Sequence, residues 1–206
     1  GQLLLGSLKK EFPSTMVFFM VSEEETAQVD FFWCGDSRGY ILDQDGLHQA
    51  TVDDVTITDA MKNLREDTPM TNVASASRPY EIHRKQVPLS KPAAVLTATD
   101  GCFGYLPSPV EFERLLLETL KEAEDMKTWK ELLKEQIFNV SGDDFSMTLW
   151  TGSYSDFQTM KESLLGRLDH LNKVYPPAGN LTEEELFLQW EKYRNSYENL
   201  WTEGED

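Results

Sequence analysis

The stretch PAAVLTATDGCFGYL, residues 92 to 106, constrains the fold more than any other part of the chain. Its middle, residues 93 to 98, is a short apolar run of strand length, which is typical of a β-strand buried in a core. The run leads directly into Asp100 and Gly101. The sequence therefore predicts a charged carboxylate directly at the end of a buried apolar strand. Such a position suggests a role for the carboxylate other than packing.

Other strand signals surround this run. Residues 14 to 21 and 29 to 36 are apolar runs joined by the acidic stretch SEEETAQ, and together they predict a β-hairpin. A second hairpin is predicted where Tyr40 to Leu42 meets the turn Asp45-Gly46. Two further strands are expected, an exposed one over PYEIHRKQVPL and another over FSMTLWTG.

Helix signals follow the strand that ends at Asp100. SPVEFERLLLETLKEAEDM and TWKELLKEQIF each carry an apolar stripe with helical spacing. Ser108, with Glu111 three residues later, predicts a capping box at the start of the first helix. A short helix over TITDAMKNLR, capped by Thr58, is also expected.

The chain changes character after residue 152. DFQTMKESLLGRLDHLNKVY and LTEEELFLQWEKYRNSYENLW predict two amphipathic helices, the second opened by a capping box of Thr182 and Glu185. Strands that do not alternate regularly with helices indicate the α+β class. We therefore predict a domain over residues 1–152 and a helical carboxy-terminal extension over residues 153–206. The extension's aromatic residues could bind an unknown partner, but packing onto the body explains their spacing more simply. They are Phe187, Trp190, Tyr193, Tyr197 and Trp201.

Composition argues against several function classes. The formal net charge is −17, which disfavours nucleic acid and anionic membrane surfaces as partners. No apolar run is long enough to span a membrane. Cys34 and Cys102 form neither a disulfide framework nor a metal-binding spacing, so we expect them to be buried small residues in a reducing, cytoplasmic setting.

Three carboxylates stand at strand borders beside glycine or another small residue. Asp36 follows one predicted strand, Asp100 follows another, and Asp143 precedes a third. Glycine allows close backbone approach, and Mg²⁺ or Mn²⁺ prefers oxygen ligands. An aspartate beside glycine at a strand end is most often a turn residue whose side chain bonds its own backbone, and this interpretation is favoured for any one of the three taken alone.

Five segments in order resemble the metal-dependent protein phosphatases, the PPM or phosphatase 2C-like family. They cover about residues 13 to 150, and the pattern of GDSR with TDG and a closing GDD-F-S carries most of the specificity. The segments are PSTMVFF, WCGDSRGYILDQDGLHQAT, MTNVASAS, LTATDGCFGYL and GDDFSMTLW.

The resemblance implies an antiparallel β-sandwich flanked by helices. It also implies a metal-dependent serine/threonine phosphoprotein phosphatase, in which two Mg²⁺ or Mn²⁺ ions activate the water that attacks phosphoserine or phosphothreonine of a protein substrate. By position, Asp100 and Asp143 match metal ligands, Gly101 is the backbone neighbour of the first, and Asp36 matches an aspartate near the ion cluster. Arg38 is expected to be a structural ion-pair partner.

Departures from the family are as informative as the matches. No DGHGG-type segment, phosphate-gripping arginine or first acidic ligand is present, so the catalytic residues are unknown. Gly104 stands where many members have a further aspartate. His48 does not fit the missing motif, and we expect it on the surface of a hairpin.

The sequence thus contains half of a two-metal site, and three explanations compete. The chain is a portion of a larger domain, or a second chain supplies the other half, or the domain has lost catalysis; the first is favoured. The alternative function is a catalytically inactive phosphatase-like binding or regulatory module. A third interpretation is an acidic α+β domain whose aspartates form turns only.

Overall fold

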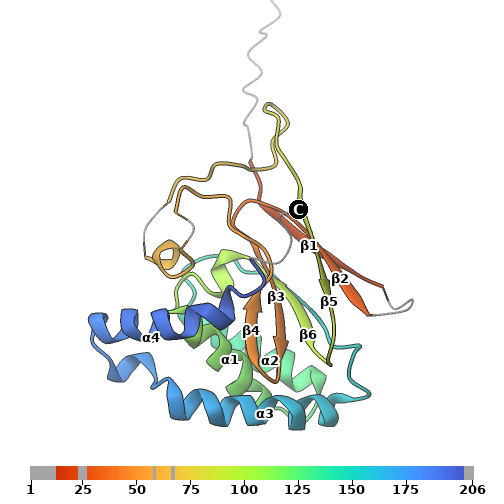
Figure 1. Cartoon of the computed structure of the whole chain (residues 1–206), viewed down its shortest axis with the longest axis vertical. Helices are drawn as coiled ribbons and strands as arrows, with labels where there is room; N and C mark the ends of the chain where they lie inside the picture. The colour runs from red at the N-terminus through yellow and green to blue at the C-terminus, as the bar shows by residue number, and fades with distance from the viewer. Residues whose placement is uncertain (1–12, 23–26, 58, 66–67, 202–206) are drawn as a thin grey trace, which may run out of the picture.

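The computed structural model describes residues 13–22, 27–57, 59–65 and 68–201. These residues contain seven strands and four α-helices (Figure 1). The elements confirm the predicted order of two hairpins, two further strands, two helices, a strand and two helices. In chain order they are β1 (Met16–Ser22), β2 (Gln28–Cys34), β3 (Arg38–Asp43), β4 (Gly46–Gln49), β5 (His83–Pro88), β6 (Ala94–Ala98), α1 (Pro109–Glu122), α2 (Met126–Val140), β7 (Met147–Trp150), α3 (Phe157–Val174) and α4 (Glu183–Tyr197).

The strands form two antiparallel sheets, one in the order β1-β2-β5 and the other in the order β4-β3-β6-β7. The strand that opened the sequence analysis, β6, lies between β3 and β7, with Ala98 opposite both Arg38 and Met147. All five β6 residues are buried. The α+β class and the antiparallel sheets are therefore as predicted.

The four-stranded sheet is the middle of three layers. Ile41 and Val95 lie in a core cluster with residues of β2 and β5, whereas Tyr40 and Leu96 lie in a second cluster with the helices. This division follows from the alternation of side chains along a strand. The predicted sandwich is present, and buried apolar side chains fill the interface between its two sheets.

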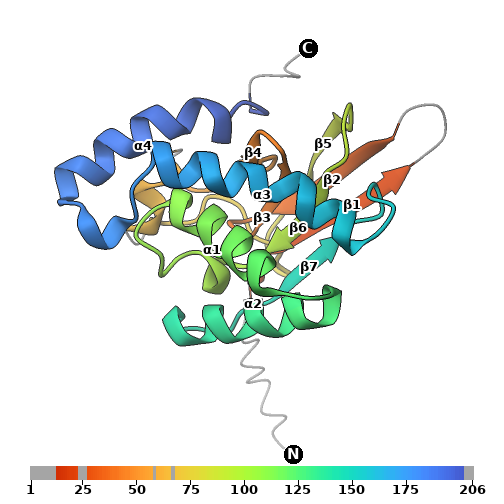
Figure 2. The same cartoon turned by 90° about the horizontal axis from the view of Figure 1, so that it is seen from below.

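The helices lie on one side of the sandwich (Figure 2). They cover the four-stranded sheet, while no helix among the described residues covers the outer face of β1-β2-β5. There Phe18 and Met20 are 41% and 55% exposed, and Phe18 stacks on Phe32 with ring centroids 4.9 Å apart. The expectation of flanking helices therefore holds for one face of the described structure.

The carboxy-terminal helices share the core of the strands. Trp190, Tyr193 and Tyr197 of α4 are buried in the same cluster as Tyr40 of β3. Glu113 of α1 accepts hydrogen bonds from the Arg167 guanidinium at 2.6 Å and from the Tyr193 hydroxyl at 2.6 Å. The aromatic residues of the extension thus pack onto the body, as the simpler of the two interpretations predicted.

The predicted caps have different outcomes. The capping box of Thr182 and Glu185 is confirmed. Ser108 precedes α1, but its hydroxyl caps nothing, and the Glu111 side chain bonds instead to Arg114 and to the backbone of Ala178. The expected helix near residue 60 is only a 3-10 turn at Lys62–Leu64, and its predicted cap, Thr58, lies outside the described residues.

The expectation of a surface His48 is wrong. The ring is buried and its Nδ1 lies 2.7 Å from the Ser196 carbonyl, while its Nε2 lies 3.3 Å from Asp43 Oδ1. Burial lowers the pKa of His48, but the hydrogen bonds with Asp43 and with the Ser196 carbonyl outweigh it, so the pKa is raised. His48 therefore connects the β3–β4 hairpin to the end of α4.

We expect His48→Gln to destabilise the fold most at low pH. A raised pKa in the folded state means that the stabilisation is complete below the unfolded value of about 6.5 and is lost as the pH rises through the folded value. The expected loss in unfolding free energy at pH 5.5 is about 1.5–3 kcal/mol, as for a hydrogen-bonded charged group. Urea unfolding at pH 5.5, 7.0 and 8.5 measures it, with the exposed His170→Gln as control. A pH-independent difference would contradict this account.

Candidate functional site

The antiparallel order β3-β6-β7 brings three predicted site segments to one edge of the sheet. The start of β3, the end of β6 and the start of β7 lie at the same end because neighbouring strands run in opposite directions. Asp36 lies just before β3, Asp100 just after β6 and Asp143 shortly before β7. Residues distant in sequence therefore meet at this edge.

The β6–β7 pairing continues to the edge itself. The Thr99 backbone N–H donates to the Ser146 carbonyl at 3.0 Å, and the Ser146 N–H donates to Thr99 Oγ1 at 2.9 Å. A Cβ on Gly101 would lie 2.3 Å from the Asp144 carbonyl oxygen. Gly101 thus permits close approach of the Asp144 backbone, and this contact fixes the two aspartate segments beside each other.

Asp100 and Asp143 both make turn-type hydrogen bonds. Asp100 Oδ1 accepts from the Gly101 N–H at 2.9 Å, and Asp143 Oδ1 accepts from the Asp144 N–H at 2.7 Å. Both residues are exposed. The turn interpretation therefore describes real contacts, but each contact uses one carboxylate oxygen and leaves the other oxygen for a ligand.

The loop that carries Asp36 is fixed from both sides. Gly35 adopts φ +102°, and its N–H donates to Asp54 Oδ2 at 2.8 Å. On the other side, Arg38 Nη2 donates to Asp53 Oδ2 at 2.7 Å. Asp54 and Asp53 thus hold the two ends of this loop through Gly35 and Arg38. The Asp36 carboxylate takes part in neither of these hydrogen bonds.

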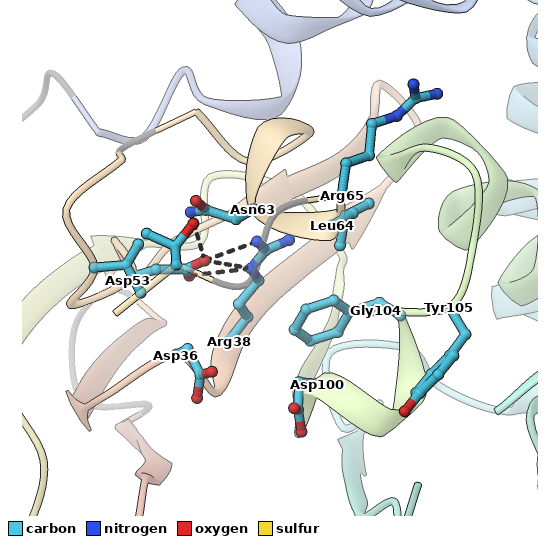
Figure 3. A pocket seen from close by; sticks show the side chains of 12 residues that line it. Asp36, Arg38, Asp53, Asn63, Leu64, Arg65, Asp100, Gly104 and Tyr105 are labelled. Atoms are coloured by element: carbon cyan, nitrogen blue, oxygen red, sulfur yellow. Dashed lines mark hydrogen bonds and ion pairs between the residues drawn. The ribbon is translucent and has the colours of Figure 1, made fainter. Parts of the chain in front are cut away.

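A pocket of about 300 Å³ joins Asp36 and Asp100. Figure 3 shows their carboxylates pointing to the same side of the pocket, with the Arg38–Asp53 pair beside them. Burial and repulsion from Asp100 and Asp53 raise the pKa of Asp36. The pocket is also lined by Arg38, Asp53, Val55, Asn63, Leu64, Arg65, Thr68, Phe103, Gly104 and Tyr105.

The chemistry of this edge partly fits a hard cation. The carboxylates of Asp36 and Asp100 are oxygen donors in one pocket, and a cation would relieve their repulsion. Asp143 does not line the pocket, although its segment adjoins Gly101. Among the described residues no group of three His, Cys, Asp or Glu side chains could hold a metal ion. The described residues therefore bring two carboxylate oxygen donors to one pocket, which is fewer than a metal ion held by protein ligands alone requires.

Comparisons with known proteins identify the architecture. No family model matches the sequence, and no curated protein matches it either. Solved structures do match: the serine/threonine phosphatase Stp1 from Staphylococcus aureus is 20% identical with a TM-score of 0.51, over 64% of this chain and 54% of that chain. A bacterial serine phosphatase bearing an R161K mutation is 14% identical with a TM-score of 0.51, over 64% and 55% of the two chains. The chain has the phosphatase 2C-like fold.

The match is partial in length. The chain spans about half of the solved phosphatases that it resembles. The rest of those phosphatases has no matched counterpart in this chain. At these identities the likeness establishes the fold, and the activity is a separate question.

Arg38 has the structural role that the sequence predicted. Its guanidinium is buried, makes three hydrogen bonds with the Asp53 carboxylate and lies 4.4 Å above the Phe103 ring. Burial lowers its pKa, but Asp53 outweighs this and the pKa is raised well above the usual value. Asp53 and Asp54 were missed by the sequence analysis, because no motif distinguishes them from other loop aspartates.

The cysteines are buried and free, as expected. Burial raises the pKa of the Cys102 thiol to about 11, and the thiol lies 3.3 Å from the Ser146 carbonyl as a hydrogen-bond donor. A protonated thiol is a poor metal ligand and reacts slowly with oxidants. Cys102 therefore belongs to the packing beneath the site. Among the described residues no helix could span a membrane.

Removing the Arg38 guanidinium should strongly destabilise the fold. Arg38→Met leaves the Asp53 carboxylate buried without its partner, and we expect a loss of about 3–5 kcal/mol in unfolding free energy. Lys127→Met is the control, because Lys127 pairs with Glu131 and both side chains are exposed (84% and 68%), so its loss should cost less than about 1 kcal/mol. Urea unfolding of the two variants measures the difference. Equal losses would show that burial of the Arg38 pair is unimportant.

Gly101→Ala should separate the two aspartate segments. The added Cβ meets backbone rather than a flexible side chain, so the β6–β7 edge must move. We expect a loss of about 1–3 kcal/mol, as for overpacking. Gly166→Ala, where no heavy atom lies within 4 Å on an exposed helix, should instead stabilise by about 0.5–1 kcal/mol. Thermal unfolding compares them, and a neutral Gly101→Ala would rule out this close contact.

Proposed function

We propose that this chain is the carboxy-terminal portion of a metal-dependent serine/threonine phosphoprotein phosphatase. The observation that carries the proposal is the meeting of Asp36, Asp100 and the Asp143–Asp144 segment at one edge of a phosphatase 2C-like sheet. The solved phosphatases with this fold support the reaction class. The substrate is a phosphoserine or phosphothreonine of a protein, and the free buried cysteines support a reducing, cytoplasmic setting.

The chain's own residues have distinct roles in this proposal. Asp100 and Asp143 would hold Mg²⁺ or Mn²⁺, and Asp36, which precedes β3 at the same edge of the sheet, would support the same cluster. When bound, the ions supply an activated water and neutralise charge on the phosphoryl oxygens. Gly101 positions the Asp100 segment against Asp144, and the buried Arg38–Asp53 pair holds the Asp36 loop. The remaining ligands and the acid come from outside the described residues.

Calorimetric titration with Mn²⁺ tests this proposal on the chain and on Asp100→Asn. We expect weak binding that the variant reduces at least tenfold, because the chain alone supplies only part of the ligand set. Asp169→Asn, on the exposed face of α3, is the matched control and should bind as the unmodified chain does. Hydrolysis of a phosphothreonine peptide is assayed beside it.

The outcomes separate the competing interpretations. Binding that depends on Asp100, with no turnover, supports a half site that awaits its missing segment. Turnover by the chain alone would mean that the ligand set is complete without that segment. Identical binding by all three proteins would leave Asp100 as a turn residue and favour the inactive binding module.

A further inference from the structure

Arg65 is a cationic residue of the pocket that contains Asp36 and Asp100. Two arginines line this pocket, and the other one, Arg38, is buried and hydrogen-bonded to Asp53. The Arg65 side chain is 26% exposed and directly follows the 3-10 turn. Figure 3 shows that it extends from the wall of the pocket with its guanidinium away from the Asp36 and Asp100 carboxylates. Arg65 therefore presents its positive charge at the pocket but away from the proposed ion cluster.

A carboxylate of α4 already binds this guanidinium. Arg65 Nη1 donates to Glu183 Oε1, and the guanidinium carbon lies 4.9 Å from the centre of the Phe187 ring. In the described part of the chain, Glu183 is the only acceptor hydrogen-bonded to this guanidinium. Stacking on a ring leaves the edge of the guanidinium plane open, and that edge is where arginine binds carboxylates. A carboxylate therefore fits beside Arg65, and the chain itself supplies the example.

A separate contact holds α4 against the same wall of the pocket. Asp59 Oδ1 accepts from the N–H groups of Met61 and Lys62 at 3.0 and 2.9 Å, at the start of the 3-10 turn. Its Oδ2 accepts from Arg194 Nη1 at 3.1 Å and from Trp190 Nε1 at 3.4 Å. One carboxylate thus connects the turn to α4, independently of the ion pair at the start of the helix.

The ion pair between Arg65 and Glu183 is suited to exchange. The Glu183 side chain is 77% exposed, and exposed ion pairs contribute little stability because water competes for both charges. Another carboxylate can replace Glu183 while Arg65 keeps its place over the Phe187 ring. The contacts of Asp59 with α4 are not involved in such an exchange.

We propose that Arg65 is a specificity residue for phosphoprotein substrates that carry an acidic side chain close to the phosphorylated residue, and that Glu183 is its intramolecular competitor. This inference rests on the proposed function, because the phosphorylated residue itself would lie at Asp36 and Asp100. The guanidinium points away from these carboxylates, so the anion that it binds is a second group of the substrate. Because one guanidinium edge holds one carboxylate, substrate binding and the Glu183 contact oppose each other.

The test uses two fluorescein-labelled peptides that contain a non-hydrolysable phosphonate analogue of phosphoserine. One peptide has a glutamate on each side of two neighbouring positions around the analogue, and the other has glutamines there. Fluorescence anisotropy with Mn²⁺, at about 150 mM salt to screen general repulsion by the acidic chain, gives the preference as the ratio of the two dissociation constants. Arg65→Gln should lower the preference for the glutamate peptide by about two- to fivefold, as for an exposed ion pair.

Two further variants at arginine positions define the role of the side chain. Arg65→Lys retains the charge without the planar fork and should keep part of the preference. Arg78→Gln makes the same charge change as Arg65→Gln at an exposed position that does not line the pocket, and it should leave the preference unchanged.

Glu183→Gln tests the competitor. Removal of the competing carboxylate should raise the preference for the glutamate peptide by about two- to fivefold. Glu184→Gln makes the same charge change in the same first turn of α4 and should leave the preference unchanged. Thermal unfolding should give the two variants the same midpoint, because the Asp59 contacts remain. An ion pair with a structural role alone predicts the opposite: a lower midpoint for Glu183→Gln and no change in peptide preference.

The outcomes keep this inference and the proposed function distinguishable. Equal effects of Glu183→Gln and Glu184→Gln, or a preference that survives Arg65→Gln, would overturn the inference. So would a failure of both peptides to bind while Mn²⁺ binding depends on Asp100, and the proposed metal site would then stand alone. If Mn²⁺ binding is independent of Asp100 but the preference follows Arg65 and Glu183, the proposed metal site fails, and Arg65 is the acid-binding residue of an inactive binding module.

Discussion

The position of β6 between β3 and β7 is the constraint on which the rest of the structure depends. β6 is buried along its whole length and pairs in antiparallel register with both neighbours. That register aligns Ala98 with Arg38 and with Met147, so the chain segments that flank these residues meet at one edge. Neither the pocket between Asp36 and Asp100 nor the contact of Gly101 with Asp144 would exist in another strand order.

The edge is held by groups that do not themselves face a ligand. Asp53 pairs with the buried Arg38, and Asp54 accepts from the Gly35 N–H, His83 and Asn72. These two adjacent carboxylates have satisfied partners, whereas Asp36 faces Asp100 and has its pKa raised by burial and repulsion. Asp53 and Asp54 therefore stabilise the loop, whereas Asp36 and Asp100 repel each other, and a bound cation would relieve this repulsion.

Much of this arrangement could be predicted from the sequence. The apolar run before Asp100, the Asp45-Gly46 turn and the Thr182–Glu185 box each depend on neighbouring residues only, and each was predicted correctly. The segments that resemble the phosphatase family also predict the antiparallel sheets, and the structure confirms them. The metal roles of Asp36, Asp100 and Asp143 remain predictions.

The failures have a common physical origin in long-range contacts. His48 is buried because α4, almost 150 residues later, presents the Ser196 carbonyl to it. Ser108 has the right spacing for a capping box, but Glu111 is held by Arg114 and by Ala178 N–H. Asp53 becomes important only through Arg38, which folding brings to it. Local patterns contain no information about such partners.

Trp190, Tyr193 and Tyr197 of α4 complete the core cluster that α1 and β3 begin on the helical side of the sandwich. Large apolar side chains are nevertheless exposed on both sides of the molecule: Phe18 and Met20 lie on the outer face of β1-β2-β5, whereas Phe138 of α2 and Leu188 of α4 are 72% and 57% exposed. Large apolar groups left at sheet faces and edges mark interaction surfaces.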